Sequence, residues 1–198
     1  MKIAVIGSGI SGLSAAYYLS KKFKVDLFEQ EDYFGGHSYT YDIKNQKKIV
    51  PVDLGFIVFN ELTYPNLLNF FKELEVPFEK SDMSFAVSIQ GSNIEYGGRG
   101  FKAIFANKSN IFNFNFLKMI IEIISFYKNA PLLIKNNLDG ETLGSYLDKS
   151  NFSKYLVEYH IIPMVAAIWS MPFSKAREIP LKLFLNFFIN HGLFKLRN

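Results

Sequence analysis

The sequence predicts an α/β protein that opens with a βαβ unit. Residues 3–6, Ile-Ala-Val-Ile, form a continuous apolar run, as expected of a parallel strand covered on both faces. The glycine-rich segment GSGISG follows at residues 7–12, and apolar residues then recur at helical spacing. A second apolar strand at residues 25–28 ends at Glu29. This order is typical of the first half of a Rossmann-like dinucleotide-binding unit.

Each glycine of the segment has its own expected role. Gly7 lets the chain turn sharply off the strand, and Gly9 has no side chain to hold a pyrophosphate away from the backbone. Gly12 lets the helix lie close to the sheet. The helix N-terminus then offers unpaired N–H groups and the positive end of its dipole to the phosphates, so no lysine is needed.

Glu29 lies about 20 residues beyond the glycines, where such units place the acceptor for a ribose hydroxyl pair. A carboxylate there disfavours a 2′-phosphate, so FAD or NAD is expected rather than NADP. The motif alone does not separate FAD from NAD, and an α/β turn that binds no ligand is the alternative to both.

The composition excludes several classes of function. Hydrophobic residues make up 49% of the 198 residues, enough for a core. The net charge of +4 is weak support for a nucleic-acid partner, because only three of the 22 basic residues are arginine and the lysine bias fits an AT-rich genome. The absence of cysteine excludes disulfides, thiolate chemistry and a flavin attached through cysteine. His160 and His191 lack metal-ligand spacing, so no metal is expected.

The sequence contains no apolar run of the roughly 18–20 residues needed to cross a bilayer. The first strand begins at Lys2 with no charged leader and apolar segment before it. We therefore expect a cytoplasmic protein, with peripheral membrane contact left open.

A second glycine feature follows Glu29. Gly35 and Gly36 form a doublet in the segment QEDYFGGHSYT, where a plain NAD-binding unit would continue into another helix. Paired glycines permit close approach to a ligand. The doublet therefore favours FAD over NAD.

Together, the segments GSGISG, FGGH with Thr40 and VDLGF at residues 52–56, with Glu29, resemble the FAD-dependent amine oxidase superfamily. This superfamily includes monoamine and polyamine oxidases, protoporphyrinogen oxidase and phytoene desaturases. The runs VDLGFIVFNELTYPNL, SDMSFAVS and HIIPMVAAIWSMP are more closely similar to bacterial predicted NAD/FAD-binding amine-oxidase-like proteins. The resemblance covers essentially the whole chain.

The resemblance implies a glutathione-reductase-type FAD-binding domain with an inserted, largely helical α+β substrate domain. On this basis residues 1–60 would form the N-terminal portion of the FAD/NAD(P)-binding domain, and residues 61–198 part of the substrate domain. The cofactor-binding residues implied for the pyrophosphate, the ribose, the phosphates and the flavin end are Gly7, Ser8, Gly9, Ile10, Ser11, Gly12, Glu29, Gly35, Gly36, His37, Gly55 and Phe56.

His37 departs from the superfamily pattern, in which arginine usually follows the glycine doublet. Histidine is mostly neutral at pH 7, whereas arginine is a fixed cation. We expect His37 to contact the cofactor by hydrogen bonding rather than as a permanent charge. The alternative is a loop histidine that faces solvent.

Beyond the doublet, patterns predict two hairpins and a series of helices. GGRG at residues 97–100 lacks a preceding parallel strand and a following Lys-Ser/Thr, so it is interpreted as a flexible turn. Pro163 and Pro172 are expected to separate helices. The predicted elements are hairpins 39–43/48–52 and 84–89/93–96, and helices 65–76, 112–127, 143–147, 152–162, 165–170 and 181–190.

The last residues, NHGLFKLRN, show no glycine-rich segment that returns to the cofactor domain, so the chain resembles the N-terminal half of its relatives. We expect a FAD-dependent oxidoreductase whose noncovalent flavin accepts a hydride from a C–N or C–C bond of a small amine or lipid-like substrate. A noncatalytic dinucleotide-binding module, completed by a missing C-terminal half or another subunit, is one alternative. An NAD-dependent dehydrogenase is another. No catalytic residue is identified from the sequence.

Overall fold

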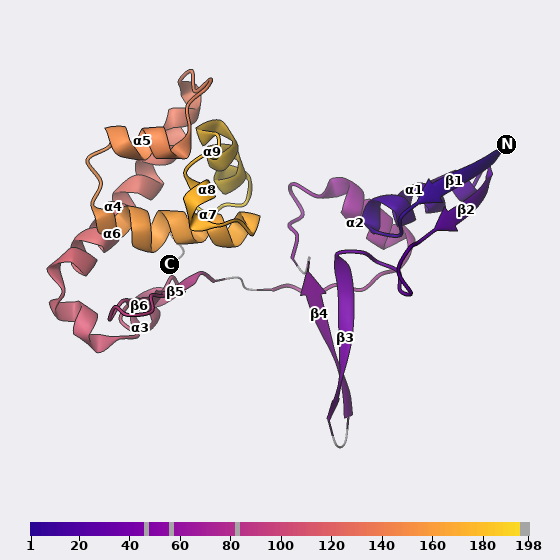
Figure 1. The fold of residues 1–198 in the computed structure, drawn as a ribbon, viewed down its shortest axis with the longest axis horizontal. Coiled ribbons are helices and arrows are strands. Elements are labelled where there is room, and N and C mark those ends of the chain that lie inside the picture. The colour runs from indigo at the N-terminus through magenta and orange to yellow at the C-terminus, as the bar shows by residue number, and fades with distance from the viewer. Residues whose placement is uncertain (46–47, 56–57, 82–83, 195–198) are drawn as a thin grey trace. The chain divides into compact units, whose positions relative to one another are not determined.

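The computed structural model describes residues 1–45, 48–55, 58–81 and 84–194. It divides into two compact units, Met1–Ser81 (unit 1) and Asp82–Asn198 (unit 2) (Figure 1). Helix α2 (Pro65–Glu73) belongs to unit 1, where the ring of Phe70 contacts those of Tyr17 and Tyr18. The predicted domain boundary after residue 60 and the boundary between the packing units therefore lie on opposite sides of α2.

Unit 1 begins with the predicted βαβ unit. Strands β1 (Lys2–Ile6) and β2 (Lys24–Phe28) pair in parallel, from Lys2 opposite Lys24 to Ile6 opposite Phe28. Helix α1 (Ile10–Ser20) connects them and packs against both strands. The α/β, Rossmann-like fold class predicted from the sequence is therefore confirmed.

The coverage of β1 differs from the prediction. We expected both faces to be covered, but Ile3 and Val5 are half-buried whereas Ala4 and Ile6 are exposed, Ile6 at 87%. Side chains alternate between the two faces of a strand, and α1 covers the face that carries Ile3 and Val5. Within the described part of unit 1, the opposite face lies open to solvent.

Both predicted hairpins are present. Strands β3 (Ser38–Asn45) and β4 (Lys48–Gly55) pair antiparallel as the long ribbon in Figure 1, and they extend beyond the predicted strands. In unit 2, β5 (Ala86–Ser88) and β6 (Glu95–Gly97) form a shorter antiparallel pair.

The rest of unit 2 is helical around an aromatic core. Phe116 and Phe126 on one helix and Phe184 and Phe188 on another are its largest fully buried side chains. Helices α3 and α8 were not predicted, because each is too short for its periodicity to be recognised. The helices are α3 (Gly100–Ile104), α4 (Phe114–Asn129), α5 (Leu143–Lys149), α6 (Lys154–Leu156), α7 (Ile162–Trp169), α8 (Phe173–Ala176) and α9 (Leu181–Asn190), with 3₁₀ turns at Lys108–Phe112 and Ala130–Lys135.

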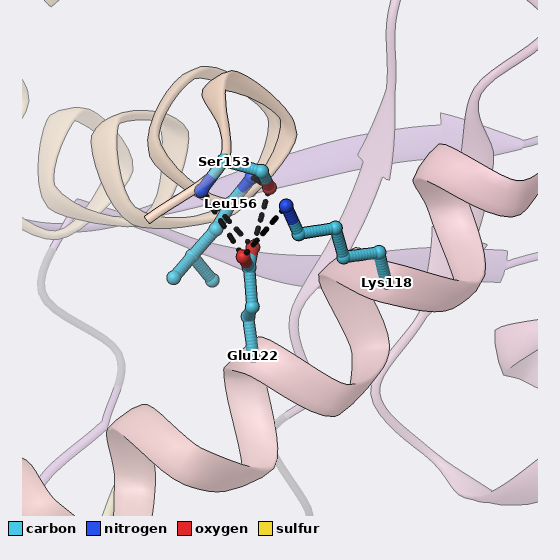
Figure 2. A network of polar contacts seen from close by, with 4 residues as sticks. All are labelled: Lys118, Glu122, Ser153 and Leu156. Atoms are coloured by element: carbon cyan, nitrogen blue, oxygen red, sulfur yellow. Dashed lines mark hydrogen bonds and ion pairs between the residues drawn. The ribbon is translucent and has the colours of Figure 1, made fainter. Parts of the chain in front are cut away.

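Helices α4 and α6 are joined by polar contacts (Figure 2). The Glu122 carboxylate of α4 accepts hydrogen bonds from the backbone N–H of Ser153, at 3.2 Å, and from the Ser153 hydroxyl. The same hydroxyl oxygen caps α6 by accepting from the Leu156 N–H at 3.2 Å, and Lys118 lies 3.8 Å from the Glu122 carboxylate. The charged residues that interrupt the apolar pattern of α4 thus position the start of α6.

Pro163 does not separate two helices, contrary to the prediction. The chain remains helical from α6 through a π-helical turn at Val157–Ile161 into α7. Proline has no N–H to donate to the carbonyl four residues earlier, and in the π-helical turn the Ile162 N–H bonds instead to the Val157 carbonyl, five residues back. Pro163 has no N–H to donate to the Tyr159 carbonyl. This carbonyl accepts a hydrogen bond from the Tyr96 hydroxyl instead, at 2.8 Å.

Candidate functional site

The candidate site lies in unit 1, at the carboxyl end of β1. Gly7 adopts φ +89°, a conformation that favours glycine, and its N–H bonds to the Phe28 carbonyl at 2.7 Å. Gly12 packs so tightly that a Cβ there would overlap the Gly7 carbonyl oxygen. The turn and the helix start are therefore built as the glycine spacing predicts.

Gly9 is different from these two glycines. Its φ of −66° suits any residue, and a Cβ there would meet no atom within 4 Å in the described structure. Neither the backbone nor packing within the chain therefore requires glycine at this position. The open space beside Gly9 would let a ligand approach the backbone closely.

Helix α1 offers an anion-binding terminus next to this space. Gly9 is its N-cap and provides no side-chain hydrogen bond, and the first turn contains no acidic residue. The N–H groups of Ile10, Ser11 and Gly12 precede the first intrahelical bond, which runs from the Leu13 N–H to the Gly9 carbonyl at 2.9 Å. With the helix dipole, these donors suit a pyrophosphate.

The glycine doublet lies directly against the GSGISG segment. Gly35 donates its N–H to the Ser8 carbonyl at 2.9 Å, and Gly9 and Gly35 form an isolated parallel bridge. Gly36 has φ +58°, and a Cβ there would lie 3.0 Å from the Cα of Gly9. The structure thus brings together two glycine segments that are about 26 residues apart in sequence.

Gly55 and His37 meet at the base of the β3–β4 hairpin. Ser38 pairs with Gly55, which has φ +78°, and a Cβ on Gly55 would overlap the His37 carbonyl oxygen. The His37 side chain is exposed, so both of its predicted roles stay predictions. Phe56 lies outside the described residues.

Glu29 accepts hydrogen bonds from its own neighbourhood. The Ser8 N–H and hydroxyl donate to Oε2, the former at 2.6 Å, and the N–H groups of Gln30 and Glu31 donate to Oε1 at 2.7 and 3.1 Å. The Ser8 hydroxyl, followed by the backbone donors, lowers the pKa of Glu29 from 4.5 to about 2. Glu29 is therefore a carboxylate at any physiological pH. The contact between Ser8 and Glu29 was not predicted from the sequence. The only indication of it there is that a small polar residue, Ser8, follows Gly7.

Unit 2 contains a surface cavity of about 610 Å³ that is largely open to solvent. It lies between the segment Phe85–Ile89 and residues of α7, with Ser170 to Phe173 completing the wall. None of the described residues that line it has an ionisable side chain. The cavity can therefore take an uncharged, largely apolar group.

A buried polar cluster lies beside this cavity, where Phe85 of the cavity wall contacts the ring of His160. The Tyr96 hydroxyl is 2.9 Å from His160 Nδ1, and the Tyr127 hydroxyl is 2.9 Å from Nε2. Burial lowers the pKa of His160 to about 3, so the ring is neutral. Tyr96 donates its single proton to the Tyr159 carbonyl, so Nδ1 must carry the histidine proton and Nε2 must accept from Tyr127.

Several known proteins are similar to this chain over the segment that forms the candidate site. Residues 5–74 match the model of the NAD(P)-binding Rossmann-like domain. Human prenylcysteine oxidase 1 is 52% identical over 50 residues, which is 23% of this chain and 10% of that protein. The 1-hydroxycarotenoid 3,4-desaturase of Flavobacterium sp. is 37% identical over 82 residues, 39% of this chain and 15% of that protein.

Among solved structures, putrescine oxidase bound to putrescine has the same fold over 98% of this chain, with a TM-score of 0.57 and 18% identity. The chain therefore shares the fold of this oxidase. It spans 44% of the putrescine oxidase chain and 10 to 15% of the two curated relatives. These matches therefore show a Rossmann-like segment and a shared fold.

Two features are absent from the part of the chain that the structure describes. No group of three or more His, Asp or Glu side chains in that part of the chain could hold a metal ion. Likewise, none of the helices formed by the described residues has the length and apolar character needed to span a membrane.

Proposed function

We propose that the chain provides the dinucleotide-binding part of a FAD-dependent oxidoreductase of the amine-oxidase type, with FAD bound noncovalently. The observation that carries this proposal is the packing of Gly35 and Gly36 against Gly9. A Cβ on Gly9 would meet no described atom within 4 Å, so there is open space beside this contact. The relatives support it, because they are named as an oxidase and a desaturase.

Each part of the site has a role in this proposal. The N-terminus of α1 and the backbone of Gly9 and Gly36 hold the pyrophosphate, and the Glu29 carboxylate accepts from the adenosine ribose. His37 donates a hydrogen bond to a phosphate oxygen, and Gly55 lies toward the flavin; Phe56, which was assigned to the same end, is outside the described residues. When bound, FAD supplies the electron chemistry by accepting a hydride from a C–N or C–C bond.

The substrate in this proposal is a small molecule with a largely apolar body. The support is the cavity of about 610 Å³ in unit 2, whose described lining has no ionisable side chain. An acyl or isoprenoid chain would match the apolar part of such a wall.

The test is FAD binding by the purified chain and by Gly9→Ala. A Cβ at Gly9 meets no atom of the described chain and sits at an allowed φ, so the variant should fold with unchanged or slightly higher thermal stability. The same methyl group would separate the pyrophosphate from its backbone donors, so FAD affinity should fall about 10- to 100-fold. Binding is measured by quenching of flavin fluorescence.

Gly98→Ala is the matched control. Gly98 belongs to neither the GSGISG segment nor the glycine doublet, and a Cβ there lies at an ordinary 3.5 Å from the Phe85 carbonyl oxygen, so FAD affinity should not change. Flavin released from the wild-type protein by denaturation would support noncovalent binding. Wild-type protein that takes up no FAD, or Gly9→Ala protein that binds FAD as well as the wild type, would overturn the proposed site.

A further inference from the structure

The strongest unexplained feature of the site is the fully buried Ser8 hydroxyl. The Ser8 residue is 0% exposed, although it lies in the loop where the ligand is expected. An ionised carboxylate can only accept hydrogen bonds, so the hydroxyl must donate its proton to Glu29 Oε2. This contact occupies the carboxylate that the proposed function assigns to the adenosine ribose.

The accepting capacity of Glu29 is full in this structure. A carboxylate has about four lone-pair sites. The Ser8 N–H and hydroxyl take the two on Oε2, and the N–H groups of Gln30 and Glu31 take the two on Oε1. A ribose hydroxyl can therefore donate to this carboxylate only where one of the four contacts gives way.

Only one of the four donors is a side chain. The three N–H groups are backbone groups of the segments that follow β1 and β2, where the Gly7 N–H bonds to the Phe28 carbonyl and the Gly35 N–H bonds to the Ser8 carbonyl. The Ser8 hydroxyl can turn about its Cα–Cβ bond. With three backbone donors remaining, Glu29 keeps its orientation when that hydroxyl leaves.

We infer that the Ser8 hydroxyl competes with a ribose hydroxyl for Glu29 Oε2, and is displaced from it when an adenine dinucleotide binds. This inference rests on the proposed function. Ser8 is then a residue that sets cofactor affinity through Glu29, by competing with the ribose for one acceptor site. A displaced, buried hydroxyl must also find another acceptor, which weakens binding further.

The experiment compares wild type, Ser8→Ala and Ser14→Ala by calorimetric titration with two probes, ADP and 2′,3′-dideoxy-ADP. Ser8→Ala removes the competitor and keeps the backbone donor, so it should bind ADP about two- to tenfold more tightly. Its affinity for dideoxy-ADP, which has no ribose hydroxyls, should not change. Ser14→Ala is the matched control, because the Ser14 hydroxyl bonds to the Ser11 carbonyl and not to Glu29; it should change neither affinity.

The inference is overturned if Ser8→Ala binds ADP no more tightly than wild type, or gains equally with both probes. Wild-type protein that binds FAD together with either result would reject the inference and leave the proposed function intact. Wild-type protein that binds neither FAD nor ADP would reject both. If Ser8→Ala does not fold, Ser8→Cys retains a weak donor of similar size and should show a smaller gain for ADP alone.

A spectroscopic measurement separates competition from a general loosening of the loop. In Ser8→Ala the carboxyl pKa of Glu29, followed by ¹³C NMR, should rise because its largest cause of depression is removed. ADP should then shift the Glu29 carboxyl resonance at lower concentration than in the wild type. A Glu29 resonance that does not respond to ADP in either protein contradicts the inference.

Discussion

Replacing Tyr96 by Phe tests the buried polar cluster of unit 2, because one hydroxyl there serves two partners. The Tyr96 hydroxyl donates to the Tyr159 carbonyl at 2.8 Å and accepts from His160 Nδ1 at 2.9 Å. Tyr96 is 4% exposed and His160 5%, so water cannot readily replace the hydroxyl. Tyr96→Phe keeps the ring and leaves a buried acceptor and a buried donor unpaired.

The expected loss of stability in Tyr96→Phe follows from these two unpaired groups. Each unpaired buried group costs about 1–3 kcal/mol, so two should lower the free energy of unfolding of unit 2 by about 2–6 kcal/mol. Tyr127→Phe should have a smaller effect, because it leaves only His160 Nε2 without its donor and Tyr127 is partly exposed. The expected loss in the free energy of unfolding is about 1–3 kcal/mol at most. Urea unfolding followed by the fluorescence of Trp169, the single tryptophan and a residue of unit 2, measures both.

Restoring a backbone donor provides the decisive control. In Tyr96→Phe the Tyr159 carbonyl lacks a partner, and Pro163→Ala supplies an N–H four residues later that can reach it if the π-helical turn becomes α-helical. The double variant should therefore be more stable than Tyr96→Phe alone, by about 1 kcal/mol. A loss below about 1 kcal/mol in Tyr96→Phe, or no recovery in the double variant, would refute the reasoning about this cluster.

Three further predictions concern single contacts. Gly12→Ala should destabilise unit 1 by about 1–3 kcal/mol in thermal denaturation, because its Cβ would overlap the Gly7 carbonyl oxygen; unchanged stability would contradict the close helix contact. Ser153→Ala should lower stability by about 0.5–2 kcal/mol in urea unfolding, because it removes the cap of α6 and a donor to Glu122; unchanged stability would contradict the role of this cap. The pKa of Glu29 is lowered to about 2, so its contribution to stability should be fully present above about pH 4.5 and be lost as the pH falls toward 2. A stability difference between wild type and Glu29→Gln that persists at pH 2 would contradict this expectation.

The parts of the fold that the sequence predicted are those determined by local pattern. The βαβ unit was recognisable because the strand, the glycine spacing and the helix follow one another within 29 residues. Helix α9 (Leu181–Asn190) begins and ends at the predicted residues, since Pro180 precedes it and Gly192 follows its C-cap. Short helices such as α8 contain too few turns for such a pattern.

What the sequence did not predict depends on partners far away along the chain. Pro163 was expected to end a helix, but Tyr96, more than 60 residues earlier, supplies the hydrogen bond that proline cannot. The contact between Ser8 and Glu29 likewise joins residues 21 positions apart, once β1 and β2 have paired. A single sequence shows which groups lack local partners but not which distant group will satisfy them.

The two units also differ in how they can be stable, and this bears on the cofactor. Among the described residues of unit 1, only Ser8 and Phe70 are buried, whereas unit 2 encloses a core of large aromatic side chains. A unit with so little buried apolar surface gains little from the hydrophobic effect. A ligand bound across Gly9 and Gly36 would add its own free energy to the folded state, about 2.7 kcal/mol at a hundredfold excess over Kd. Gly9, which leaves space at the site, therefore gives up packing within the chain, and a bound dinucleotide would replace that packing.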